Sequence, residues 1–241
     1  MNFLLAFFVI SSASSVFLIR YALKWLATSY KFQLFGKMIA RVDTQEKVLA
    51  LTYDDGPNPP YTDSLLDVLS EFDAKATFFA VGESIENNVE TTRRMIAEGH
   101  ELGNHSYSHK QLVNVGLDTI RSEIQKTDDL LTKLGAKSET LFRAPYGLKR
   151  IRLPWELARR NKVSVLWDVD PKDFENPGPE AIADAIVDNV QPGSIVLMHD
   201  GMQDGDRDRS QTVTATRLAL QQLKKEGYQF KTVSQLMALA K

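Results

Sequence analysis

The sequence predicts an α/β fold in which parallel strands alternate with helices packed outside them. From Lys47 onward, short apolar runs alternate with longer segments whose apolar residues recur at helical spacing. This alternation gives seven strand–helix units. Titratable residues follow several of the apolar runs directly, as expected where parallel strands end in functional loops. The spacing alone does not separate a closed barrel from an open sheet.

The expected strands are short, and several helices begin or end at proline or glycine. We expect strands at residues 48–52, 76–81, 101–103, 141–142, 164–167, 194–198 and 228–231. We expect helices at residues 59–72, 89–98, 117–134, 154–161, 179–190 and 213–226, and one more at the end of the chain. Pro60 and Pro154 are helix-opening signals. Gly99, Gly135 and Gly227 are expected to end helices.

Length and composition fit one domain with a large core. The chain has 241 residues, of which 43% are hydrophobic and 25% are charged, as is ordinary for a soluble globular domain. The net charge of −2 gives no indication of a nucleic-acid partner. The sequence has no cysteine, which excludes disulfides and thiolate sites. Any metal site must therefore use His, Asp and Glu.

Residues 1–19 form a candidate membrane anchor or signal segment. No charged side chain lies between Asn2 and Ile19. This length is at the short end of the roughly 17–25 residues that a spanning helix needs. The small residues at 11–15 could hold a signal-peptidase site. A peripheral or core helix is the third interpretation, so the sequence leaves anchor and cleaved signal open.

Residues 20–46 are expected to be a basic, aromatic-containing linker. The segment carries Arg20, Lys24, Lys31, Lys37 and Arg41 together with Trp25, Tyr30, Phe32 and Phe35. Such a stretch suits a membrane surface, and it suits a surface helix packed on the domain equally well. Basic residues after the apolar run favour a cytoplasmic catalytic domain by the positive-inside rule. That orientation conflicts with the exported location indicated by the motifs below.

Two histidines and two acids form the strongest pattern. His105 and His109 stand four residues apart, and on a helical turn both would face one divalent ion. Asp54 and Asp55 follow the first strand, and adjacent carboxylates repel unless a cation or hydrogen bonds stabilise them. The alternatives are surface histidines and an Asx-type turn. Two His and one Asp with an open fourth position suit catalytic zinc, and the second carboxylate could act as a base on water.

Two further residues follow strands, and three acids lie between them. Arg143 could hold a carboxylate, although a surface arginine is an equal alternative. His199 follows a buried-type run, where a core histidine is the commoner outcome. By default the acids are loop-capping residues: Asp168, Asp170 and Asp173.

Taken together, the motifs resemble those of a known family. They are TYDDGP at 52–57, HSYSH at 105–109, RAPYG at 143–147, D-x-x-D-F at 170–174 and LMH at 197–199. Their order is similar to that of the polysaccharide deacetylases, which form carbohydrate esterase family 4 and share the NodB-homology domain. The resemblance covers residues 47–241 and implies a distorted (β/α)7 barrel, here preceded by an N-terminal hydrophobic helix.

The resemblance also implies a division of roles. Asp55, His105 and His109 would ligate a divalent ion, most simply Zn²⁺, with Co²⁺ or Ni²⁺ as alternatives. Asp54 would be the general base, and Arg143 would orient it.

The resemblance implies further roles for three residues. His199 would be the general acid, and Asp173 would hold it in the right state. The backbone N–H of Tyr146 would help to stabilise the oxyanion. The acetyl methyl would lie among Tyr146, Phe174 and Leu197. Two residues depart from the family pattern, because Tyr53 stands where Phe is usual and Phe174 where Trp is usual.

The implied activity is metal-dependent hydrolysis of the N-acetyl group of an amino sugar in a poly- or oligosaccharide, with release of acetate. Chitooligosaccharide, peptidoglycan and exopolysaccharide are all candidate substrates. Two alternatives remain: a deformylase or deacetylase of a lipid-linked sugar, and a glycan-binding protein with a vestigial site. We expect a membrane-anchored enzyme with its catalytic domain outside the cytoplasm, and keep cytoplasmic-facing and secreted forms as alternatives.

Overall fold

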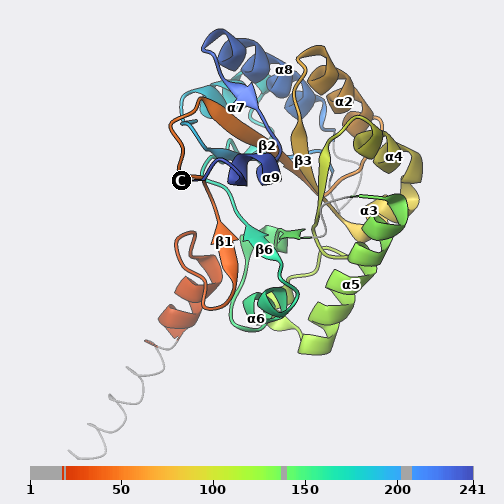
Figure 1. The fold of residues 1–241 in the computed structure, drawn as a ribbon, viewed down its shortest axis with the longest axis vertical. Helices are drawn as coiled ribbons and strands as arrows, with labels where there is room; N and C mark the ends of the chain where they lie inside the picture. The colour runs from red at the N-terminus through yellow and green to blue at the C-terminus, as the bar shows by residue number, and fades with distance from the viewer. Residues whose placement is uncertain (1–17, 19, 137–139, 202–207, 241) are drawn as a thin grey trace, which may run out of the picture.

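The computed structural model describes residue 18 and residues 20–136, 140–201 and 208–240. One curled parallel sheet carries helices on its outside (Figure 1). Its strands are β1 (Lys37–Ile39), β2 (Val48–Asp54), β3 (Ala76–Ala80), β4 (Glu101–Asn104), β5 (Leu141–Phe142), β6 (Val163–Val165), β7 (Ile195–His199) and β8 (Gln229–Phe230). They run in the order β1-β6-β5-β4-β3-β2-β7, and β8 pairs with the start of β2.

Isolated bridges bring the two edges of this sheet together. Val169, which follows β6, forms a parallel bridge with Val196 of β7, and Arg41, which follows β1, forms an antiparallel bridge with Ser194. The Asp168 carboxylate also accepts hydrogen bonds from the Ser194 hydroxyl and the Ile195 N–H. The curled parallel sheet with helices outside it confirms the predicted (β/α)7 fold class.

The helices alternate with the strands along the chain. They are α2 (Tyr61–Glu71), α3 (Gly82–Asn87), α4 (Val89–Ala97), α5 (Leu117–Leu134), α6 (Arg152–Arg159), α7 (Pro179–Val187), α8 (Ser210–Lys225) and α9 (Val233–Met237). The bounds of α5 are those predicted, because Gly135 ends the helix in the left-handed region at φ 82°. Helix α3 was not predicted, and α8 begins earlier than expected.

Strand β2 contributes residues to two of the three hydrophobic core clusters that the described residues form. Every residue of β2 is buried, and its side chains alternate between the two faces of the sheet. Val48 and Ala50 pack inside the barrel, whereas Leu51 and Tyr53 pack against the outer helices. The Tyr53 hydroxyl lies 3.1 Å from the Thr216 hydroxyl oxygen, so the extra oxygen relative to Phe has a buried partner.

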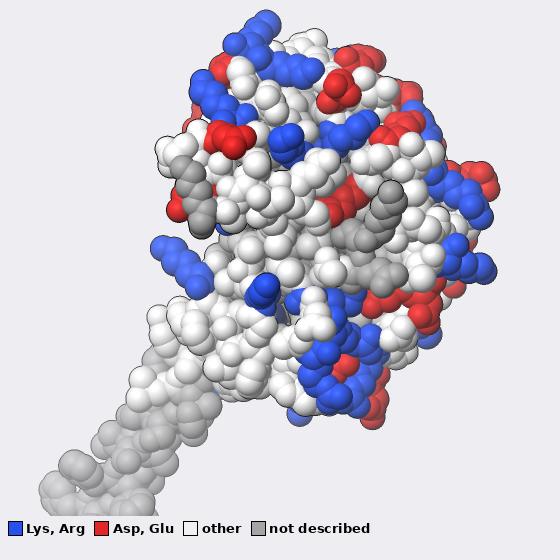
Figure 2. Space-filling view, in the orientation of Figure 1, with Lys and Arg blue, Asp and Glu red and all other residues white. Residues whose placement is uncertain are grey.

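The described part of the N-terminal segment has a short helix at residues 20–28, followed by strand β1. Residues 1–17 and 19, where we expect the anchor or signal, lie outside the described residues. Among the residues that are described, no helix is long and apolar enough to cross a bilayer. Large apolar side chains on this segment are exposed, including Tyr21, Trp25 and Phe32, and its surface is mostly white in Figure 2.

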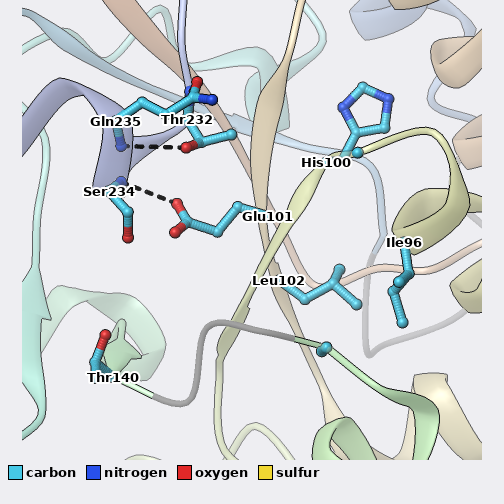
Figure 3. A pocket seen from close by; sticks show the side chains of 10 residues that line it. Ile96, His100, Glu101, Leu102, Thr140, Thr232, Ser234 and Gln235 are labelled. Atoms are coloured by element: carbon cyan, nitrogen blue, oxygen red, sulfur yellow. Dashed lines mark hydrogen bonds between the residues drawn. The ribbon is translucent and has the colours of Figure 1, made fainter.

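The end of the barrel where the strands begin carries a cavity of about 390 Å³ (Figure 3). It lies between the start of β4 and the start of α9. The Glu101 carboxylate accepts hydrogen bonds from the Thr77 hydroxyl and the Ser234 N–H. Glu101 therefore joins β3, β4 and α9, a structural role that is typical of this end of a barrel.

Candidate active site

The predicted site residues meet at the carboxyl ends of the strands. Asp54 ends β2 and lies in register with His199 at the end of β7. His105 follows β4, and Arg143 follows β5, which pairs with β4. Because parallel strands carry these residues to one edge, groups from distant parts of the sequence converge there.

Three of these side chains form a cluster suited to a metal ion. One ligand atom from each of Asp55, His105 and His109 lies within 4.8 Å of the others. Asp55 Oδ1 is 3.1 Å from His109 Nε2 and 3.4 Å from His105 Nε2. All three residues are buried.

The loop that carries the histidines differs from the helical turn we expected, and that expectation was wrong. Ser106 and His109 have φ values of 66° and 52°, in the left-handed region. The Glu123 carboxylate, from helix α5, accepts hydrogen bonds from the backbone N–H groups of Tyr107 and Ser108. Contacts from a distant helix therefore shape this loop, and the histidines converge without a helix.

The atoms of the cluster fit a divalent cation. Asp55 Oδ1 is buried without a hydrogen-bond donor among the described residues, although it faces two imidazole nitrogens. His105 Nδ1 donates a hydrogen bond to the Arg143 carbonyl oxygen at 2.8 Å, which leaves Nε2 as the acceptor atom facing Asp55. Burial raises the pKa of Asp55, but the neighbouring imidazoles of His105 and His109 outweigh it and hold that pKa far below its usual range. Two nitrogens and one carboxylate oxygen with an open side are typical of catalytic zinc sites.

The second carboxylate of the pair has a different partner. Arg143 donates from Nη1 to Asp54 Oδ1 at 2.7 Å and to the Thr52 hydroxyl at 2.8 Å. Its other nitrogens donate to the carbonyl oxygens of Val165 and Leu166. Burial lowers the pKa of this guanidinium, and the charge of Asp54 opposes that change. A fully buried arginine thus fixes the orientation of Asp54.

His199 is held by a buried acid on the other side of the site. Its Nδ1 donates to Asp173 Oδ1 at 2.8 Å, and its backbone N–H donates to Asp173 Oδ2 at 2.9 Å. The Thr212 hydroxyl also donates to that second oxygen. Burial lowers the pKa of His199, but the hydrogen bond and charge of Asp173 outweigh it and raise the pKa to about 9. His199 is therefore suited to carry a proton at neutral pH.

Comparison with known proteins gives this constellation a family. A family model described as polysaccharide deacetylase matches residues 41–165. A peptidoglycan-N-acetylglucosamine deacetylase of Bacillus cereus is 38% identical over 204 residues, which cover 84% of this chain and 93% of that protein. The chain belongs to the polysaccharide deacetylase family.

Two further relatives agree with this assignment. A chitooligosaccharide deacetylase of Sinorhizobium fredii is 34% identical over 206 residues, covering 83% of this chain and 96% of that protein. The crystal structure of a peptidoglycan N-acetylglucosamine deacetylase superposes with a TM-score of 0.80 at 31% identity, covering 86% of this chain and 95% of that one. The predicted class of reaction, hydrolysis of a non-peptide carbon–nitrogen bond by a polysaccharide deacetylase, is confirmed at the level of the family.

In this deacetylase a cavity of about 420 Å³ opens above Asp54 and the cluster of Asp55, His105 and His109. The three residues expected around the acetyl methyl all line it: Tyr146, Phe174 and Leu197. The Tyr146 ring lies 4.7 Å from the His109 ring between centroids, and Phe174 meets His199 edge-on at 5.8 Å. Tyr146 has a φ of 60°, in the left-handed region that non-glycine residues seldom adopt, within the turn that follows β5.

Four residues that line or support the site were missed by sequence reasoning: Tyr30, Trp167, Asp200 and Arg209. Asp200 accepts a hydrogen bond from the Thr62 hydroxyl, and burial together with the charges of Asp55 and Asp54 raises its pKa to about 7. A Cβ on Gly56 would lie 2.1 Å from an Asp200 carboxylate oxygen, so the turn after Asp55 needs glycine. Asp200 directly follows the LMH motif, and that adjacency was its signal in the sequence.

Proposed function

We propose that this deacetylase is a metal-dependent enzyme that removes the N-acetyl group from N-acetylglucosamine units of an envelope glycan, with peptidoglycan as the favoured substrate. The observation that carries the proposal is that the Asp55, His105 and His109 cluster, Asp54 and His199 all line one cavity. The substrate choice follows the relative from Bacillus cereus, which this chain matches over nearly that protein's full length.

The metal would be held by Asp55, His105 and His109, and Zn²⁺ suits their nitrogen and oxygen donors best, with Co²⁺ or Ni²⁺ as alternatives. When bound, the ion would polarise the acetamide carbonyl and lower the pKa of a water molecule. His105 is oriented for this role by its hydrogen bond to the Arg143 carbonyl oxygen.

The protein's own groups would manage the protons. Asp54 accepts a proton from the water whose oxygen adds to the acetamide carbon, while Arg143 keeps that carboxylate aligned. The backbone N–H of Tyr146 stabilises the negative charge on the carbonyl oxygen. His199, paired with Asp173, donates a proton to the departing nitrogen as the carbon–nitrogen bond breaks. The products are acetate and a free amine on the sugar.

The location belongs to the same proposal. Relatives named for peptidoglycan act on a glycan of the cell envelope, which favours a catalytic domain outside the cytoplasm. Residues 1–19 would attach it to the membrane or direct its export, with residues 20–46 leading into the catalytic domain at 47–241. Fusion of the N-terminus to a topology reporter distinguishes anchor from cleaved signal, and outward from inward orientation.

The decisive experiment measures acetate and amine release from peptidoglycan fragments and chitooligosaccharides by the full chain. We expect release that a chelator abolishes and zinc restores, with peptidoglycan preferred. Release that resists chelation would contradict the metal-dependent mechanism. Release from a lipid-linked sugar alone would replace the proposed substrate, and a metal-loaded chain that binds glycans without turnover would favour the vestigial alternative.

A further inference from the structure

One residue of the segment before β1, outside the family motifs, reaches the cavity above the Asp55, His105 and His109 cluster. Tyr30, in the segment before β1, lines this cavity together with Gly147 and Trp167. Its ring meets the Trp167 ring at nearly a right angle, with 5.5 Å between centroids. The Trp167 ring in turn lies 5.4 Å from the Arg143 guanidinium. Trp167 therefore lies between Tyr30 and Arg143, the residue whose guanidinium binds Asp54.

The backbone around Tyr30 is fixed to the loop that follows β5. The Lys149 N–H donates to the Ala27 carbonyl oxygen at 2.9 Å, and the Lys149 ammonium donates to the Ser29 carbonyl oxygen. Lys149 is almost fully buried, although it is a lysine. It lies two residues beyond the RAPYG motif, so the same loop positions Tyr146 and the segment that carries Tyr30.

The Tyr30 ring packs against Trp167 and is still partly exposed. A Cβ on Gly147 would lie 2.9 Å from the Trp167 ring, so glycine permits Trp167 to approach this loop. Tyr30 remains 45% exposed while it lines the cavity. A ring that is held by a second aromatic and faces a cavity presents a flat apolar surface with a polar tip. Such a surface matches a pyranose ring, which has apolar C–H faces and hydroxyls at its edge.

We infer that Tyr30 is a specificity-determining residue that stacks against a sugar ring of the glycan chain, and that Lys149 is a positioning residue for it. This inference rests on the proposed glycan substrate. Tyr30 contacts neither Asp54 nor the cluster of Asp55, His105 and His109. Its stacking on the sugar ring therefore strengthens binding of the ground state and of the transition state equally. Loss of such uniform binding raises KM and leaves kcat unchanged.

The test compares Tyr30→Ala, Tyr30→Phe and Tyr21→Ala in the full chain, with kcat and KM measured on an N-acetylglucosamine tetramer. Tyr21 lies on the same segment but does not line the cavity, and it is the matched control. We expect Tyr30→Ala to raise KM about tenfold with kcat within about twofold, Tyr30→Phe to raise KM by less because the ring is retained, and Tyr21→Ala to resemble the wild type. Lys149→Met should raise KM by a smaller factor.

The inference is overturned if Tyr30→Ala leaves KM unchanged, or if it lowers kcat while KM stays the same. Calorimetric titration of each variant in an Asp54→Asn background with the same tetramer reads the contact without turnover. If the wild-type chain releases no acetate but binds the tetramer more tightly than Tyr30→Ala does, the proposed function is contradicted and this inference is supported. An active enzyme whose KM does not depend on Tyr30 would contradict this inference and leave the proposed function intact. If none of the proteins binds the tetramer, the inference is contradicted as well.

Discussion

The two histidines at the ends of strand β4 are both buried, yet different groups surround their rings. His100 precedes the strand, where the Ala76 N–H donates to its Nδ1 at 3.2 Å and Phe78 packs edge-on against its ring. Burial lowers the pKa of His100 to about 4, so the ring is neutral. His105 follows the strand, and although burial opposes it, the charges of Asp54 and Asp55 raise its pKa.

The difference lies in the carboxylates, because both side chains are almost inaccessible to water. Among the described residues, His100 has a backbone N–H within hydrogen-bonding range, and the nearest carboxylate, that of Glu98, is 3.8 Å away. His105 Nε2, in contrast, faces Asp55 Oδ1 at 3.4 Å. Carboxylates that favour a proton on an imidazole also favour a metal cation between them. A buried histidine therefore indicates a site only where the fold brings an acid to it, and in this barrel that happens at the carboxyl end.

The largest effect is expected on metal affinity, at the cluster of Asp55, His105 and His109. Asp55→Ala should lower zinc affinity by more than about 100-fold, because even groups outside the ligand set contribute about 10–100-fold. Glu101→Gln, at the other end of β4, should leave zinc affinity unchanged. Competition with a chromophoric chelator measures both variants. Equal affinities would show that Asp55 is not a ligand.

Asp54→Asn should lower kcat by about 10²–10⁴-fold, the range typical of a lost general base, while zinc remains bound. The substitution also leaves the buried Arg143 without its carboxylate partner, which costs stability. Thermal unfolding and zinc content must therefore be measured beside kcat. A folded, zinc-loaded variant with wild-type kcat would remove Asp54 from the mechanism.

The pair formed by His199 and Asp173 should determine the basic limb of the pH profile. The raised pKa of His199, about 9, keeps its proton available at lower pH, so kcat should fall as pH rises through that region. Asp173→Asn removes the charge that raises this pKa, and the limb should move toward the ordinary value of about 6.5. The charge of Asp55 also raises the pKa of His199, and a cation bound to Asp55 would offset that charge. The size of the movement therefore depends on the cation, and its direction is the decisive readout. A limb that moves upward or stays would contradict the assignment of His199 as the acid.

Sequence reasoning succeeded where the signal was local and failed where it was not. The end of helix α5 was predicted correctly because Gly135 ends it. The convergence of Asp54, His105 and His199 followed from their positions after strands, although their roles stay predictions.

The failures share a dependence on distant partners. The left-handed residues of the histidine loop depend on Glu123 in α5. Strand β1 has three residues and exists through its pairing with β6. Tyr30 reaches the cavity only because Trp167 and Lys149 hold it there. No pattern within a short window of sequence encodes these contacts.

The smallest effect is expected at His100, where the comparison between the two ends of β4 can be made quantitative. His100→Gln should leave kcat within about twofold, because the residue lies at the end of the barrel away from the cavity that Asp55, His105 and His109 line. Its folded pKa of about 4 lies below the ordinary value of about 6.5, so the unfolded chain takes up the proton first as pH falls.

The stability contributed by neutral His100 should therefore be complete above about pH 6.5 and decline as pH falls toward 4. His100→Gln should remove about 1–3 kcal/mol of that decline, measured as the difference in urea-unfolding free energy between pH 7 and pH 5. Glutamine can still accept the Ala76 hydrogen bond through its side-chain oxygen, so the variant tests titration more than packing. An equal decline in both proteins would show that burial of His100 does not control acid stability, and a loss of kcat would show that both ends of β4 serve catalysis.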